Sequence, residues 1–457
     1  MHEIAGLTLA LAIRYKSKTF NTEPRNFRFI VNLALIIQPE LKQATQITDQ
    51  RSPQDRLTEA CGLAQAIDLE IVHTEIINIA RPRAASLLGP GVVERIAATA
   101  EDLDHPLILI NASLTPVQHR NLERALSCKV IDRTALILEI FGARAESHAG
   151  RLQVELAALT FQKSRLVRSW THLERQRGGG GFLGGPGERQ LELDKRMLTD
   201  QIKQIQKELC EVKRTRTLQR ANRQRSQTPT IALVGYTNAG KSTLFNRMTG
   251  ADVLSKDMLF ATLDPTIRGV ELPGGRHVLM GDTVGFISNL PTELVEAFKS
   301  TLEEITQSDL ILHVQDISAA DFEQEASDVR AVLADIGIDV LEQSGKVLNV
   351  YNKSDNLDAE LLSIYRDSLD GILCSAVSGA GLDRLCQKIE DIFNQDDICL
   401  SLKLAPQLAS AAAWLYENGQ VTASFYDEDG HHHITVTLSP ADKQRFIQRW
   451  PEIDLSP

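Results

Sequence analysis

Residues 231–242 constrain the fold of this chain more than any other part of the sequence. Ile231-Ala-Leu-Val is an apolar, strand-like run, and it leads into Gly235-Tyr-Thr-Asn-Ala-Gly-Lys241-Ser242, which has the pattern GxxxxGK[ST]. In such a loop the backbone N–H groups turn inward around a phosphate, and glycine at both ends permits the dihedral angles and the close approach. Lys241 would meet the β- and γ-phosphates, and Ser242 would coordinate Mg²⁺. We therefore expect a strand, a phosphate loop and a helix in an α/β unit.

A second motif supplies the other side of the phosphate site. Asp282-Thr-Val-Gly285 follows the strand-like residues 277–280, so its carboxylate can hold a water of the Mg²⁺ shell. Gly285 can offer an N–H to the γ-phosphate. The next residue is Phe286, where many small GTPases carry the glutamine that orients the attacking water. Because phenylalanine cannot orient water, we expect slow intrinsic turnover that needs a partner surface, another residue or a monovalent cation.

Two more segments specify the base. Asn352-Lys-Ser-Asp355 follows the strand-like residues 347–351. Asp355 offers two acceptor oxygens to the guanine N1–H and 2-amino group, and adenine lacks both donors. Ser375-Ala-Val377 begins 20 residues after Asp355, and it is the candidate loop whose backbone N–H meets guanine O6. The four motifs in this order predict a GTP-binding and GTP-hydrolysing protein.

The residues between the phosphate loop and Asp282 include a candidate sensor of the γ-phosphate. Phe260-Ala-Thr-Leu-Asp-Pro-Thr266 contains two threonines that could reach Mg²⁺, and we favour Thr262 over Thr266. Asn238 is a candidate position for recruiting K⁺, with simple capping of the loop as the alternative.

These motifs give a complete set of candidate site residues. The candidate catalytic residues are Lys241, Thr262 and Gly285. The candidate metal ligands are Ser242 and Thr262, with Asp282 acting through a water molecule. The candidate GTP-binding residues are Gly235, Tyr236, Thr237, Asn238, Ala239, Gly240, Lys241, Ser242, Thr243, Phe260, Ala261, Thr262, Leu263, Asp264, Asp282, Thr283, Val284, Gly285, Asn352, Lys353, Ser354, Asp355, Ser375, Ala376 and Val377.

The patterning along the chain predicts an α/β multidomain fold. The 457 residues exceed what one core usually supports, so we expect several units in series. Residues 29–37, 69–79, 107–110 and 129–131 read as strands, and they alternate with helical patterns at 54–67, 92–103 and 116–126. The expected units are an N-terminal extension (1–24), a parallel α/β domain (25–148), a basic helical hairpin (149–226), a P-loop GTPase domain (227–396) and a small α+β domain (397–457).

The hairpin prediction comes from a change of period. Leu152, Leu156, Leu159, Leu166, Trp170 and Leu173 recur at helical spacing, and so do Leu191, Leu198, Ile202, Ile205, Leu209 and Val212. Two such seams would bury against each other as an antiparallel pair. The connector, residues 177–187, is too rich in glycine to continue either helix.

The charge of the chain is unevenly distributed. Residues 151–226 hold 17 lysines and arginines against 8 aspartates and glutamates, so this segment carries +9 while the rest carries −20 of the net −11. Such asymmetry favours a polyanionic partner for the hairpin. The six cysteines are scattered and no run of eighteen apolar residues occurs, so we expect a cytoplasmic protein with reduced thiols and no integral membrane segment. The run His431-His-His433 has no evident partner ligands, which disfavours a metal site there.

Several segments outside the nucleotide motifs resemble the HflX family of ribosome-associated GTPases, in the translation-factor-related class and the Obg-HflX-like superfamily. They are residues 130–141, 152–156 and 172–176, the glycine loop, and Gly185-Pro-Gly-Glu-Arg-Gln-Leu-Glu192. The resemblance runs from about residue 27 to the end; residues 1–24 have no counterpart, and 146–150 depart from the usual pattern. It implies a monomer that binds GTP and GDP and splits stalled or idle ribosomes at the large ribosomal subunit. The implied ribosome contacts are Gly178, Gly179, Gly180, Gly181, Phe182, Leu183, Gly184 and Gly185. A regulatory GTP switch that acts on a protein partner is the alternative.

Overall fold

The computed structural model describes residues 33–41, 51–176, 186–226, 228–251, 259–260, 266–288, 305–306, 308–335, 346–395, 397–451 and 453. The expected extension 1–24, the candidate residues 261–264 and the candidate ribosome contacts 178–185 lie outside this description. The α/β multidomain fold expected from the sequence is confirmed. In the described residues the sheets have four, six and three strands.

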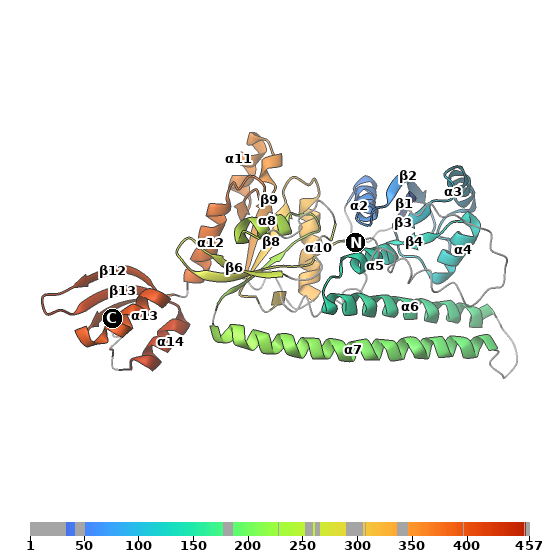
Figure 1. The fold of residues 1–457 in the computed structure, drawn as a ribbon. Coiled ribbons are helices and arrows are strands. Elements are labelled where there is room, and N and C mark those ends of the chain that lie inside the picture. Colours follow the sequence, from blue (N-terminus) through green and yellow to red (C-terminus); the bar gives the residue numbers. More distant parts are fainter. Residues whose placement is uncertain are drawn as a thin grey trace.

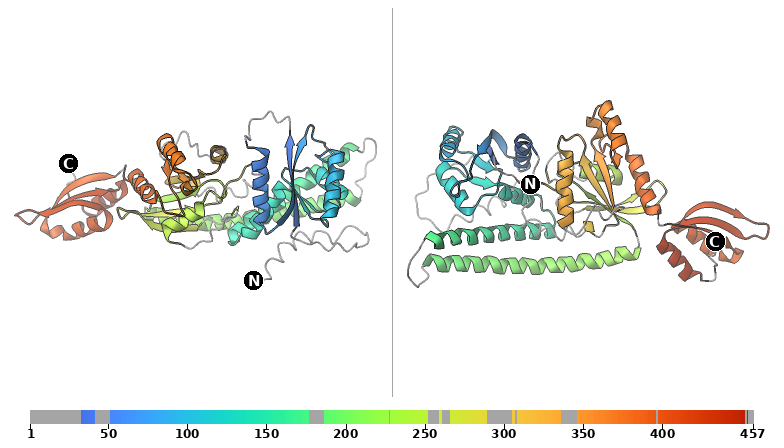
Figure 2. Two further views of the ribbon diagram at one scale, coloured as in Figure 1. Left: turned by 90° about the horizontal axis from the view of Figure 1, so that it is seen from above. Right: turned by 180° about the vertical axis from the view of Figure 1, so that it is seen from behind.

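The N-terminal unit is a parallel sheet with helices on both faces (Figure 2). Its strands lie in the order β2-β1-β3-β4. The apolar side chains of the sheet pack on one face against α3 and α4 and on the other against α2 and α5. Its elements are β1 (Leu33–Leu41), α2 (Pro53–Gln65), β2 (Glu70–Ile79), α3 (Pro90–Asp102), β3 (Leu107–Ile110), α4 (Pro116–Leu126), β4 (Val130–Asp132) and α5 (Arg133–Arg144).

The first strand ends later than predicted, at Leu41 instead of residue 37. The added residues include Pro39, which has no backbone N–H to donate to a ladder. In the structure β3 pairs only with β1 residues 34–37, so Pro39 lies where β1 has β2 alone as a neighbour. A missing N–H is tolerated there.

The helical hairpin forms as predicted from α6 (His148–Gln176) and α7 (Pro186–Ser226). The two helices run side by side beneath the N-terminal unit, and the longer α7 continues beneath the nucleotide unit (Figure 1). Leu152 of α6 and Ile202 and Ile205 of α7 are buried, as the seam requires. The connector is shorter than the predicted 177–187, because Pro186 begins α7; proline suits a first helical position, where no backbone N–H partner is needed.

The nucleotide unit has strands in the order β10-β9-β8-β5-β7-β6, and only β6 runs antiparallel to its neighbour. Helices α8 and α12 pack on one face, and α10 covers the face toward the N-terminal unit (Figure 1). Its elements are β5 (Thr230–Val234), α8 (Lys241–Thr249), β6 (Thr266–Glu271), β7 (His277–Asp282), β8 (Leu310–Asp316), α10 (Phe322–Asp335), β9 (Val347–Asn352), the 3-10 helix η1 (Ser354–Asn356), α11 (Ala359–Ser368), β10 (Ile372–Leu373) and α12 (Leu382–Asn394).

The C-terminal unit is an antiparallel sheet, in the order β11-β13-β12, with helices α13 and α14. It lies at the far end of the molecule from the N-terminal unit (Figures 1 and 2). The elements are β11 (Ile398–Leu404), the 3-10 helix η2 (Pro406–Leu408), α13 (Ala409–Asn418), β12 (Gln420–Tyr426), β13 (His432–Leu438) and α14 (Pro440–Arg449). None of the helices in the described part of the chain combines the length and the apolarity that a membrane crossing requires.

The expectation that the histidine run has no partner ligands was wrong. Ligand atoms of Asp427, Asp429 and His431 lie within 4.8 Å of one another. Lys403 Nζ already lies 2.9 Å from Asp427 Oδ2, so an ammonium group supplies positive charge to this carboxylate.

Candidate active site

The phosphate loop depends on glycine at both ends. A Cβ at Gly235 would clash with the carbonyl oxygen of Val314 on β8. Gly240 has φ +85° and lies against Asn352 Nδ2, so a side chain there would meet both strain and a clash. Asn238, the candidate K⁺ position, also has a positive φ of 62°, which asparagine tolerates better than most residues. The atoms around the loop therefore leave no room for a side chain at either of these two glycines.

Lys241 lies inside this loop as the first residue of α8. Its side chain is buried, and Nζ donates to the carbonyl oxygens of Gly235 at 3.0 Å and Tyr236 at 2.7 Å. Burial lowers the pKa of Lys241 to about 8, although the carboxylates of Asp282 and Glu325 oppose the shift. The positive charge of Lys241 is thus poorly solvated, and a nearby phosphate group would stabilise it.

Two of the three candidate metal ligands, Ser242 and Asp282, lie next to each other at the phosphate loop. Ser242 Oγ donates to Asp282 Oδ2 at 2.7 Å, although the two residues are 40 positions apart in sequence. Asp282 ends β7 and is fully buried. A hydroxyl next to a carboxylate is an oxygen donor set that Mg²⁺ accepts when phosphate and water complete the shell. The residues present therefore fit a magnesium ion.

The segment that follows Asp282 packs directly on the phosphate loop. Thr237 N donates to Phe286 O at 2.7 Å, and Phe286 N donates to Gly235 O at 3.1 Å. A Cβ at Gly285 would lie 2.9 Å from Thr237 Cγ2 and 3.1 Å from Lys241 Nζ. The side chain of Phe286 is buried in the core that joins the two units. Its ring therefore packs in that core and has no polar group to offer an attacking water.

Asn352 joins the base-recognition segments to the phosphate loop. Its Nδ2 donates to Ala239 O at 2.9 Å, and its Oδ1 accepts from Ala376 N at 2.9 Å. Lys353 Nζ lies 2.6 Å from Asp316 Oδ2 at the end of β8. Asp355 stands in η1 with an exposed carboxylate, as base recognition from solvent would require.

The remaining candidate residues divide into those near the site and those that the structure does not describe. Thr283 Oγ1 donates to Leu233 O at 2.6 Å, so this hydroxyl supports the strands. Ser375 Oγ accepts from Ser378 N at 3.0 Å and shapes its own loop. Thr266, the weaker candidate sensor, is the first residue of β6 and pairs with Asp282. Thr262, the favoured sensor, lies outside the described residues together with Ala261, Leu263 and Asp264.

Comparison with known proteins identifies the family. Four family models match successive segments: GTP-binding GTPase N-terminal (54–142), GTP-binding GTPase Middle Region (144–223), 50S ribosome-binding GTPase (230–353) and HflX C-terminal domain (365–453). A protein of Magnetococcus marinus named GTPase HflX is 47% identical over 357 residues, which cover 78% of this chain and 81% of that relative. The GTPase HflX of Escherichia coli is 39% identical over 407 residues, 88% of this chain and 94% of that relative. The chain belongs to the HflX family of GTPases.

As a member of the HflX family, the chain is a GTP-hydrolysing enzyme, and GTPases of this kind generally use Mg²⁺. The resemblance found in the sequence is thereby confirmed. The geometry is consistent with this activity, because the candidate residues for phosphate, metal and base converge at the carboxyl ends of β5, β7 and β9. In open α/β sheets this edge is the usual place for a ligand.

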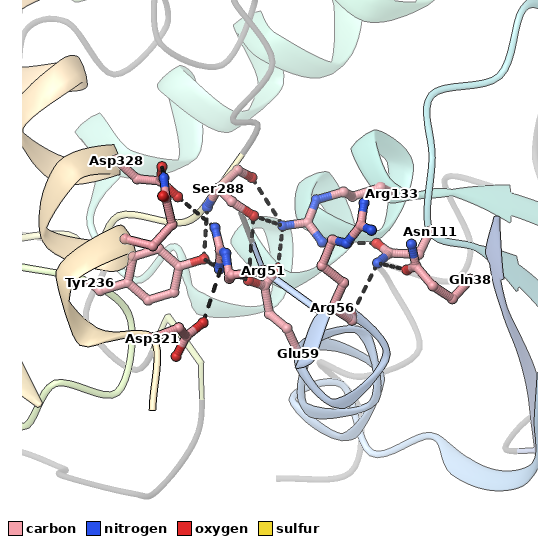
Figure 3. Close-up of polar contacts among 11 residues, drawn as sticks. Gln38, Arg51, Arg56, Glu59, Asn111, Arg133, Tyr236, Ser288, Asp321 and Asp328 are labelled. Atoms are coloured by element: carbon pink, nitrogen blue, oxygen red, sulfur yellow. Dashed lines mark hydrogen bonds and ion pairs between the residues drawn. The ribbon is translucent and has the colours of Figure 1, made fainter. Parts of the chain in front are cut away.

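Other polar residues near the site of this HflX-family chain were not found from the sequence. The side chains of Arg51, Glu59 and Arg133 reach Tyr236 of the phosphate loop or Ser288 beyond Gly285 (Figure 3). Each comes from the N-terminal unit, between 155 and 185 residues away from its partner. No local motif marks such distant pairs.

Proposed function

We propose that this enzyme holds the triphosphate of GTP in the 235–242 loop and reads guanine with Asp355. The observation that carries the assignment is the contact between Ser242 Oγ and Asp282 Oδ2, beside the buried Lys241. Bound Mg²⁺ would neutralise negative charge on the β- and γ-phosphates, held by Ser242 and Thr262 directly and by Asp282 through water. Lys241 and the N–H of Gly285 would then stabilise the charge on the transferred phosphoryl group.

We further propose that the enzyme binds the large ribosomal subunit through the hairpin and splits stalled or idle ribosomes. The charge of +9 over residues 151–226 suits a phosphate-lined surface. The antiparallel α6 and α7 would present the 178–185 loop at one end of a long, stiff pair. Phe182 and Leu183 in that loop could stack on RNA bases or wedge between them. The ribosome named in the 50S ribosome-binding GTPase model supports the same partner.

The loop assignment predicts a defect in splitting without a defect in nucleotide binding. In a Phe182→Ser and Leu183→Ser double variant, splitting of ribosomes should slow by about tenfold, since stacking contributes about 1–3 kcal/mol per base. The affinity for GTP should stay at the wild-type value. Light scattering follows splitting, and titration with a fluorescent GTP analogue follows affinity. The matched control is Leu193→Ser with Met197→Ser, which removes apolar side chains from the exposed face of α7.

Measurements of GTP turnover separate the ribosomal partner from the alternative of a protein-directed switch. GTP turnover should rise strongly with purified large subunits, and high salt should remove the rise, because contacts to RNA phosphates release counterions. Normal splitting by the double variant would contradict the loop assignment. Turnover indifferent to large subunits would favour a protein partner.

We also propose K⁺ as a second cation, near Asn238 in the phosphate loop. Asn238 is exposed at a left-handed position, and the buried ring of Phe286 cannot orient water. A cation there would add positive charge to that of Lys241 near the transferred phosphoryl group. Turnover should be several-fold faster in K⁺ than in Na⁺ at equal ionic strength, and Asn238→Ala should remove the difference. Equal GTP turnover in K⁺ and Na⁺ would contradict the K⁺ proposal and favour the alternative that Asn238 only caps the loop.

A further inference from the structure

Tyr236 points its side chain away from the phosphate loop and into the N-terminal unit (Figure 3). Its hydroxyl accepts from Arg51 Nη1 at 2.7 Å and from Ser288 N at 2.9 Å, and it donates to Glu59 Oε2 at 2.6 Å. A phenol has one donor and two acceptor positions, so all of them are used. Burial and the neighbouring Glu59 raise the pKa of Tyr236, and the hydroxyl therefore keeps its proton.

Ser288 is held from a second side by Arg133 at the start of α5. Arg133 Nη2 donates to Ser288 O at 3.0 Å and to Ser288 Oγ at 3.1 Å, and it also contacts Glu59. Arg133 Nη1 donates to Asn111 Oδ1 at 2.8 Å, which fixes the guanidinium within the N-terminal unit. The backbone N–H, the carbonyl and the hydroxyl of Ser288 are thus all bonded to side chains of this network (Figure 3).

Ser288 is three residues beyond Gly285, and Gly285 limits the space at the phosphate loop. A methyl group on Gly285 would already approach Thr237 Cγ2 to 2.9 Å and Lys241 Nζ to 3.1 Å. A γ-phosphate that contacts both Lys241 and the Gly285 N–H therefore needs the Gly285 segment to move outward. Because only two residues separate Gly285 from Ser288, that movement would displace Ser288 and strain its hydrogen bonds to Tyr236 and Arg133.

Arg51 also connects the N-terminal unit to a different part of the nucleotide unit. Its Nη2 lies 2.5 Å from Asp328 Oδ2 on α10, and its Nε lies 3.9 Å from Asp321 Oδ2. The side chain of Arg51 is almost fully buried, so breaking these pairs would leave an uncompensated charge. The contact at α10 can therefore hold the two units together while Ser288 shifts.

We propose that Arg51, Glu59 and Arg133 couple the N-terminal unit to binding of the γ-phosphate. Through Tyr236 and Ser288 they stabilise the arrangement in which Gly285 lies against Lys241, and so oppose entry of the γ-phosphate. GTP binding and the packing of the N-terminal unit are then linked, and each alters the other by the same free energy. The inference rests on the proposed roles of Lys241 and Gly285 in binding the γ-phosphate.

Glu59→Gln tests the inference, because it keeps the shape of the side chain and removes the charge that Arg51, Arg133 and Tyr236 share. The ratio of the dissociation constant for a non-hydrolysable GTP analogue to that for GDP should fall by about fivefold or more, the lower end of typical couplings between sites. Titration with fluorescent nucleotides gives both constants. Glu75→Gln is the matched control, since Glu75 pairs with Arg95 at the surface of the same unit.

A second variant keeps the test decisive if Glu59→Gln does not fold. Arg133→Lys retains the positive charge, but one ammonium cannot reach Ser288, Glu59 and Asn111 together, so the ratio should fall here too. In the wild type, hydrogen exchange in residues 53–65 and 133–144 should also differ between GDP and the GTP analogue. Two results would overturn the inference. One is a folded variant whose ratio of dissociation constants equals that of the Glu75→Gln control; the other is wild-type hydrogen exchange that is the same with GDP and with the GTP analogue. If the proposed GTP site were wrong, the wild-type protein would bind neither GDP nor the GTP analogue.

Discussion

Lys241→Ala is expected to weaken GTP binding by at least about a hundredfold, because two hydrogen bonds to charged phosphate oxygens are worth about 1.5–3 kcal/mol each. Lys241 is buried, and its Nζ now lies on the carbonyl oxygens of Gly235 and Tyr236. Alanine would leave the phosphate loop without a positive charge at its centre. Titration with a fluorescent GTP analogue measures the loss, and hydrolysis should fall at least in parallel.

The control for this variant is Lys388→Ala, which removes an exposed lysine from α12 and should leave affinity unchanged. The wild type offers an independent check, because the pKa of Lys241 is lowered to about 8. Raising the pH from 7 to 8.5 deprotonates most of this lysine in the free protein, and the GTP dissociation constant should rise about fourfold. Unchanged affinity in Lys241→Ala would show that the lysine does not contact the triphosphate.

Asp355→Asn is expected to reduce guanine affinity by on the order of 10²- to 10⁴-fold, since both hydrogen bonds from the base are made to a charged carboxylate. The amide replaces one acceptor oxygen by a donor, which opposes the guanine 2-amino group and matches the xanthine 2-oxo group. The variant should therefore prefer xanthosine triphosphate. Asp355 is exposed in η1, so its replacement has little to disturb in the core.

Competition between GTP and xanthosine triphosphate for the same fluorescent probe measures the change of preference. Asp367→Asn on α11 is a suitable control, because it removes an exposed carboxylate twelve residues away. If Asp355→Asn kept the wild-type preference for guanine, another group would have to recognise the base.

The sequence was most informative where function requires short motifs with fixed spacing. The phosphate loop follows a parallel strand, and Asp282 and Asn352 are each the last residue of one, so their convergence at one edge of the sheet could be expected from sequence order alone. The hairpin was similarly predictable, because a helical period of leucine and isoleucine persists over both arms.

Two features were missed for different reasons. Strand β11, ICLSLKL, was not predicted, although its apolar and polar residues alternate and Leu400, Leu402 and Leu404 are buried; one short run of alternation before an alanine-rich segment is a weak signal. The contacts of Arg51 and Arg133 with the nucleotide unit have no local signal, because their partners lie more than 150 residues away. Only the folded chain brings them together.

Because α7 is one continuous helix, its number of residues sets both the distance between its ends and the direction in which the side chains at each end point. Over 41 residues at 1.5 Å each the helix spans roughly 60 Å, and it ends shortly before β5. Adding two residues to it would rotate one end against the other by about 200° and turn Ile202 and Ile205 toward solvent, whereas adding seven would leave only about 20° of error. The number of residues between the glycine loop and the nucleotide pocket can therefore change without turning the buried face only by insertions close to whole turns, such as about seven or eleven residues.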